Sequence, residues 1–168
     1  TWGKWLQERL ETYRLPRSVR ERAGARLPKY IRPVFRDKTD IGIGALERTL
    51  GRELSDSRFL IVVCSPHSAR STWVNREIEH FREMGRGDRI IPFIVAGAPG
   101  ADDPKESCYP PVLPRDLLGA SVPDLGREKA FIKVVATLLG LKFDYLWDRH
   151  RRRDRRRRLV QGIAATTL

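Results

Sequence analysis

Two side chains that could act together on a ligand are Trp73 and Glu77, which stand four residues apart in the sequence. Residues 71–84 have the apolar spacing of an amphipathic helix, in which an i, i+4 pair lies on one side, a turn apart. The apolar run of residues 58–65 precedes this helix, and open α/β sheets bind ligands beyond the carboxyl ends of their strands. An aromatic ring and a carboxylate held there could bind a sugar and its attached base.

The phase of this helix separates Glu77 from its neighbour Glu79. At about 100° per residue, the core-facing stripe contains Val74, Ile78 and Phe81. Glu77 falls at the border of that stripe, whereas Glu79 points to solvent. A structural role, in which Glu77 pairs with a nearby arginine and Trp73 packs at the helix start, fits the same spacing and stays open here.

The elements that would position these side chains alternate between strand and helix along the chain. The apolar patterns predict strands at residues 31–35, 58–65 and 89–97, and a short strand near 120–122. They predict helices at residues 2–15, 45–57, 71–84 and 127–147, the last interrupted at Gly140. Such alternation is typical of an α/β fold with a doubly wound parallel sheet of the flavodoxin-like type, covered by helices on both faces.

The first predicted element is a helix, although the first strand of a flavodoxin-like sheet lies at its centre. We therefore expect the first β-strand to be absent from this sequence, and the parent gene to encode an apolar strand just before Thr1. Without it, the predicted strands at residues 31–35 and 58–65 would lack the neighbour that they share.

Most of the positive charge lies in one segment. Of the net charge of +12, residues 149–158 contribute +7, from eight arginines and one aspartate. This segment could be a solvated tail, an arm that binds polyanions, or a juxtamembrane segment on an anionic membrane surface. Residues 159–168 are too short to span a bilayer, which takes roughly 20 residues. We therefore divide the chain into a domain at 1–147, an arginine-rich linker or juxtamembrane segment at 148–158, and the start of an apolar or disordered segment at 159–168.

The rest of the composition is that of one globular domain, with 168 residues, 40% hydrophobic and 32% charged. The two cysteines, Cys64 and Cys108, suggest no disulfide, so we expect a cytoplasmic location, tethered to the inner face of the membrane if an apolar segment follows Leu168. No metal site is expected from the spacing of the three histidines, His67, His80 and His150. We expect no nucleic-acid partner, because the basic charge is concentrated in the tail.

Three motifs carry a resemblance to a known family. They are F-R-D-x-x-D-I-x-x-G at residues 35–44, S-R-x-L-I-V-V-x-S at residues 57–65, and S-x-W-V-x-x-E-I at residues 71–78. Together they resemble a TIR (Toll/interleukin-1 receptor) domain of the bacterial type. The resemblance covers about residues 2–147 and lacks the opening strand of the family.

The resemblance implies a function, since many TIR domains hydrolyse or cyclise NAD⁺. It implies that Glu77 is the catalytic residue and that Trp73 forms an aromatic wall of the substrate site. The loop that corresponds to the family's mobile loop over the pocket supplies further substrate-binding candidates, Arg36, Asp37, Asp40 and Gly44. Ser65, at the carboxyl end of its predicted strand, is another candidate, although a serine before Pro66 also suits a plain turn.

Two functions from different classes follow from these observations. One is a signalling enzyme that cleaves NAD⁺ at the nicotinamide–ribose bond when TIR domains assemble, with NAD⁺ as its substrate and no cofactor. The other is a non-catalytic TIR scaffold that acts only by association with other TIR domains. The presence of Glu77 beside Trp73 favours the enzyme. A phospho-accepting receiver domain is set aside, because it needs an aspartate where this chain has Cys64 and Ser65.

Overall fold

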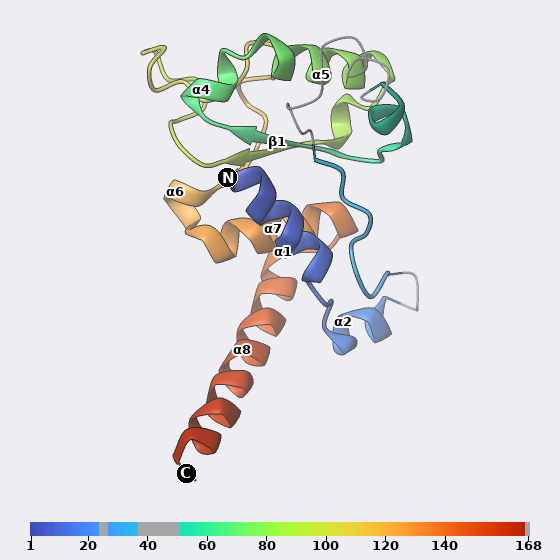
Figure 1. The fold of residues 1–168 in the computed structure, drawn as a ribbon, viewed down its shortest axis with the longest axis vertical. Coiled ribbons are helices and arrows are strands. Elements are labelled where there is room, and N and C mark those ends of the chain that lie inside the picture. The colour runs from blue at the N-terminus through green and yellow to red at the C-terminus, as the bar shows by residue number, and fades with distance from the viewer. Residues whose placement is uncertain (24–26, 37–50, 167–168) are drawn as a thin grey trace.

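The computed structural model describes residues 1–23, 27–36 and 51–166 (Figure 1). The N-terminal helices are α1 (Trp2–Thr12) and α2 (Arg17–Arg22). The central elements are β1 (Leu60–Cys64), α4 (Pro66–Ala69), α5 (Thr72–Glu83), the 3-10 turn η1 (Gly87–Arg89) and β2 (Ile90–Ile94). The C-terminal elements are β3 (Ala120–Ser121), α6 (Val122–Leu125), α7 (Arg127–Leu139) and α8 (Phe143–Thr166). Residues 51–56 are also helical, and residues 45–50 of the helix predicted at 45–57 lie outside the described residues.

The three described strands form a parallel sheet in the order β1-β2-β3. Leu60 lies opposite Ile90 and Cys64 opposite Ile94, so β1 and β2 pair along their whole length. The pairing with β3 is shorter and begins at Phe93, directly after Pro92. Proline has no backbone N–H to donate to a neighbouring strand. The parallel α/β sheet predicted from the sequence is confirmed.

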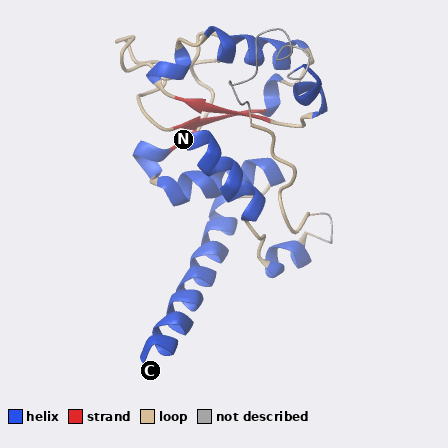
Figure 2. Ribbon diagram, in the orientation of Figure 1, coloured by secondary structure: helices blue, strands red, loops and turns tan. Residues whose placement is uncertain are grey.

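Helices cover both faces of this sheet, as Figures 1 and 2 show. On one face, α1 and α7 pack with Ile91 and Phe93 of β2 into a single apolar cluster. On the other face, the core residues of α5 pack with alternate residues of the strands, among them Val62 and Ile90. Successive side chains of a strand point to opposite faces, so the apolar runs of β1 and β2 supply both clusters.

The strand predicted at residues 31–35 is wrong. None of its residues belongs to a described strand. Its backbone bonds to side chains of α1 instead: Gln7 Nε2 donates to the carbonyl of Val34 at 2.8 Å, and the Val34 N–H donates to Glu11 Oε1 at 3.2 Å. Pro33 removes a further donor. The apolar pattern of this segment is therefore satisfied by packing on α1.

The last helix also differs from the prediction. The interruption at Gly140 is confirmed, because Gly140 ends α7 in the left-handed conformation with φ of 64°. However, a second helix, α8, continues past Trp147 to Thr166 and extends away from the sheet (Figure 1). The arginine-rich segment is therefore helical, and its role as a linker, a juxtamembrane segment or a polyanion-binding arm stays a prediction. Arginine is a good helix former, and His150 within the segment is buried.

The described helices include none that is both long enough and apolar enough to cross a bilayer.

Candidate functional site

The start of α5 is fixed at the carboxyl-end side of β1 by local hydrogen bonds. Ser71 caps the helix, and its side chain accepts from the Val74 N–H at 3.4 Å. The Asn75 side-chain amide donates to the carbonyls of Ala69, at 3.2 Å, and Ser71, at 2.9 Å. These bonds tie the end of α4 to the first turn of α5, which carries Trp73. The position of this turn is thus set by the backbone that follows β1.

The faces of α5 are arranged as the helix phase predicts. Ile78 and Phe81 are completely buried in the core cluster of this face. Glu79 is exposed, and Glu77 is half-buried between the core and the solvent side. Two carboxylates on one helix therefore differ in environment, which gives a direct comparison for mutagenesis.

The indole N–H of Trp73 has no hydrogen-bond acceptor among the described residues. The residue is half-buried, while its indole Nε1 is fully buried. A buried N–H without an acceptor is costly, and most such groups in proteins are paired. The half-buried ring of Trp73 thus lies one turn from Glu77.

Ser65 lies at the carboxyl end of β1, as predicted. Its side chain accepts from the Ser68 N–H at 3.2 Å, while its own N–H donates to Ser68 Oγ at 2.8 Å. This reciprocal pair is a capping box for α4. The alternative of a local structural role, weighed from the sequence, therefore has a physical basis. A role in substrate binding stays a prediction.

The loop candidates are only partly described. Arg36 donates from Nε to Gln7 Oε1 at 3.2 Å, so its described hydrogen bond is to α1. Helix α1 covers the opposite face of the sheet from α5 (Figure 1). The described contacts therefore do not bring Arg36 to Trp73 and Glu77. The other three loop candidates, Asp37, Asp40 and Gly44, lie outside the described residues.

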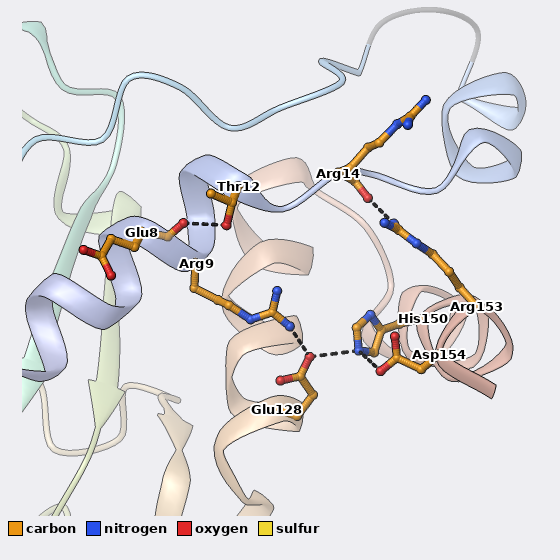
Figure 3. Close-up of polar contacts among 8 residues, drawn as sticks. All are labelled: Glu8, Arg9, Thr12, Arg14, Glu128, His150, Arg153 and Asp154. Carbon is orange, nitrogen blue, oxygen red and sulfur yellow. Dashed lines mark hydrogen bonds and ion pairs between the residues drawn. The ribbon is translucent and has the colours of Figure 1, made fainter. Parts of the chain in front are cut away.

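A second polar cluster, which the sequence analysis missed, joins three helices (Figure 3). Glu128 of α7 accepts from Arg9 of α1, with 2.5 Å between Nη2 and Oε1. His150 Nε2 lies 2.9 Å from the same Glu128 oxygen and 3.4 Å from Asp154 Oδ2. The i, i+4 spacing of His150 and Asp154 was a visible signal, but only the fold brings Glu128 beside them.

The carboxylate of Glu128 is stabilised in its charged form by these neighbours. The close approach of the His150 imidazole lowers the pKa of Glu128, and the positive charge of Arg9 lowers it further. Burial acts in the opposite direction and is outweighed. Together, Glu128, His150 and Asp154 place one ligand atom each within 4.8 Å of one another. A metal ion there would have to displace Arg9 from Glu128, so we interpret the cluster as an interhelical tie.

The parallel sheet, covered by helices on both faces and carrying polar side chains after β1, defines an α/β protein of the flavodoxin-like type. Residues 1–135 match the family model described as TIR domain, and the chain belongs to the TIR domain family. The family predicted from the three sequence motifs is confirmed.

One curated relative is similar to part of the chain. It is named NAD(+) hydrolase ApTIR, from Actinoplanes sp., and it is 34% identical over 88 residues. The match covers 48% of this chain and 12% of the relative, so the chain spans only a small part of that protein. No solved structure matches the chain.

Proposed function

We propose that this TIR domain cleaves NAD⁺ at the nicotinamide–ribose bond, with Glu77 as its catalytic carboxylate. The observation that carries the proposal is the place of Glu77, half-buried on α5 one turn after Trp73. The name of the relative supports it, because that protein is called an NAD(+) hydrolase. NAD⁺ is the substrate in this proposal, and the chemistry needs no cofactor.

The reaction suits a single carboxylate. When the bond between nicotinamide and ribose breaks, its electron pair leaves with nicotinamide, which departs as a neutral molecule. Positive charge then builds on C1′ and the ring oxygen of the ribose. A carboxylate beside the sugar stabilises that charge, as in glycoside hydrolysis. Glu77 takes this role, while Trp73 stacks against a ring of the substrate.

Assembly completes the site in this proposal. Copies of the TIR domain associate and complete each other's sites, and Ser65, Asp37, Asp40 and Gly44 are the proposed substrate-binding residues. Activity then depends on protein concentration, because an assembled enzyme is populated by mass action. Association without catalysis is the rival function, and it predicts assembly without release of nicotinamide.

The test is nicotinamide release from NAD⁺ by the concentrated protein, with Glu77 and Glu79 substituted separately. Glu77→Gln should abolish release while the protein keeps its melting transition, because Glu77 is not a core residue. Glu79→Gln removes the same charge from the same helix at an exposed position, and it should leave the rate unchanged. Equal losses in both variants would mean that net charge or folding was measured, and the assignment of Glu77 would be wrong.

Trp73→Ala tests the aromatic wall. Loss of one stacked ring costs roughly 1–3 kcal/mol if nucleotide stacking is a guide. We expect both a higher KM for NAD⁺ and a lower kcat. A variant with unchanged KM would exclude Trp73 from the substrate site.

A further inference from the structure

A basic cleft of about 540 Å³ lies between the chain around α2 and the helix α8. Three arginines from the N-terminal part line it, Arg14, Arg17 and Arg20. Four more come from α8, namely Arg149, Arg152, Arg153 and Arg156. None of the residues that line this cleft belongs to α5 or β1, so it is separate from the site of the proposed NAD⁺ chemistry.

The helical geometry brings these side chains together. The four arginines of α8 follow each other at i, i+3, i+4 and i+7, a spacing that places them on one face of the helix. Arg17 and Arg20 are three residues apart in α2 and likewise share a face. The chain therefore turns one basic face of α8 toward a second basic face at α2.

Buried neighbours hold the two walls of the cleft in place. Leu15 and Val19 are 3% and 1% exposed, and His150 on α8 is 5% exposed. Arg153 donates a hydrogen bond to the carbonyl of Arg14, which joins α8 directly to the chain before α2 (Figure 3). The cleft is thus part of the packed structure and exists before any ligand binds.

The lining of the cleft concentrates positive charge. The cleft is lined by seven arginines and, among the described residues, by no acidic side chain. Arg17 pairs with Glu21 at 2.6 Å outside the lining, in an exposed contact. Arg20 Nε is buried without a hydrogen-bond partner among the described residues. Like charges gathered in this way repel each other, and a bound anion would relieve that repulsion.

We infer that the cleft binds a small anion that carries two or more phosphate groups. The planar guanidinium group donates two parallel hydrogen bonds to phosphate oxygens, so several converging arginines suit several phosphates. The volume falls in the range of small-molecule sites, roughly 300–1,000 Å³. The seven arginines line one hollow together with Leu15 and Pro16, whereas nucleic acid would need an extended basic surface.

The test is calorimetric titration with sodium tripolyphosphate at about 0.15 M salt, where exposed charges are largely screened. The double variant Arg20→Gln, Arg152→Gln removes one charge from each wall and should weaken binding by at least about tenfold. The matched control, Arg70→Gln with Arg115→Gln, removes two exposed charges outside the cleft and should change affinity by less than about twofold. Equal weakening in both, or no binding by the unmodified protein, would overturn the site.

Two further measurements keep the test decisive. If the glutamine variant fails to melt cooperatively, Arg20→Lys with Arg152→Lys keeps both charges but removes the planar donor pairs, and it should still weaken binding. Sulfate at equal ionic strength should bind at least about tenfold more weakly than tripolyphosphate. Equal affinity for the two anions would contradict a site for several phosphates.

Vesicles and an oligonucleotide identify the source of the phosphates. If vesicles with phosphatidylinositol 4,5-bisphosphate bind in a cleft-dependent manner and phosphatidylserine vesicles of equal charge do not, the source is a lipid headgroup. If tripolyphosphate binds and neither vesicle does, the source is a free compound. Equal binding to both kinds of vesicle would mean simple attraction to a charged surface, and it would overturn the proposed site. Cleft-dependent binding of a single-stranded oligonucleotide, tighter than that of tripolyphosphate, would replace the proposed site with a nucleic-acid site.

Nicotinamide release should be unchanged in the cleft variants. Failure of the anion-binding proposal is therefore distinct from failure of the NAD⁺ proposal.

Discussion

The tie formed by Arg9, Glu128 and His150 should contribute measurably to stability, because it joins α1, α7 and α8. Glu128→Gln keeps the size of the side chain but removes its charge. Hydrogen bonds to charged groups contribute about 1.5–3 kcal/mol, but the Glu128 side chain is 38% exposed, so solvent screening reduces its share. We expect a loss of about 1–2 kcal/mol, a decrease in melting temperature of roughly 2–8 °C for a chain of this size.

The direction in which the stability difference changes with pH follows from the pKa of Glu128. Because the pKa of Glu128 is lowered in the folded protein, its contribution is complete above the pKa of the unfolded chain, about 4.3. The contribution is lost as the pH falls through the lowered folded value. Thermal unfolding followed by circular dichroism should therefore show the full difference between the two proteins at neutral pH. The difference should shrink progressively below about pH 4.

Glu8→Gln is the matched control for this measurement. Glu8 pairs with Lys4 on α1 at 3.8 Å, and both side chains are more than 60% exposed, at 63% and 64%. An exposed pair contributes little, so we expect a change below about 0.5 kcal/mol. A Glu128 variant as stable as the control, or a difference that persists unchanged at pH 3, would refute the role of this tie.

Two further predictions concern the core and the turns. Burial raises the pKa of the Cys64 thiol to about 12. Iodoacetamide at pH 8 should therefore leave Cys64 unmodified in the folded protein and modify it after unfolding. Rapid alkylation of the folded protein, measured by mass spectrometry, would contradict this prediction. Gly97→Ala should destabilise more than Gly140→Ala in urea unfolding. Both have a positive φ, but an added Cβ at Gly97 would lie 2.4 Å from the Glu106 carbonyl oxygen, whereas the one at Gly140 meets open space. Gly140→Ala should cost only about 1–2 kcal/mol, and the reverse order would contradict the prediction.

Local patterns were sufficient for the parts of the fold that bury long apolar runs. The runs at residues 58–65 and 89–97 became β1 and β2, because continuous apolar segments suit strands covered on both faces. The phase of α5 correctly separated Phe81 from Glu79, because the helical period is regular. The segment at 31–35 was misread, since its backbone partners lie on α1 and no local pattern reveals them.

The arginine-rich segment shows what composition alone misses. Its charge left a solvated tail, a polyanion-binding arm and a juxtamembrane segment open, and none of these readings indicated that His150 is buried beside Glu128 of α7. The cleft depends on Arg20 and Arg152, which are far apart in the sequence and meet only in the fold. For the NAD⁺ site, the sequence predicted the environment of Glu77 on its helix, but it could not predict that the Arg36 side chain bonds to Gln7 on α1.

The most direct test of the central proposal is the initial rate of nicotinamide release from NAD⁺, compared between the unmodified protein and its Glu77→Gln variant at one high protein concentration. We expect slow release by the unmodified protein and none by the variant, with matching melting curves. Release at the same rate by both proteins would contradict the catalytic role of Glu77. Absence of release by the unmodified protein in its assembled form would contradict NAD⁺ cleavage itself and favour a scaffold.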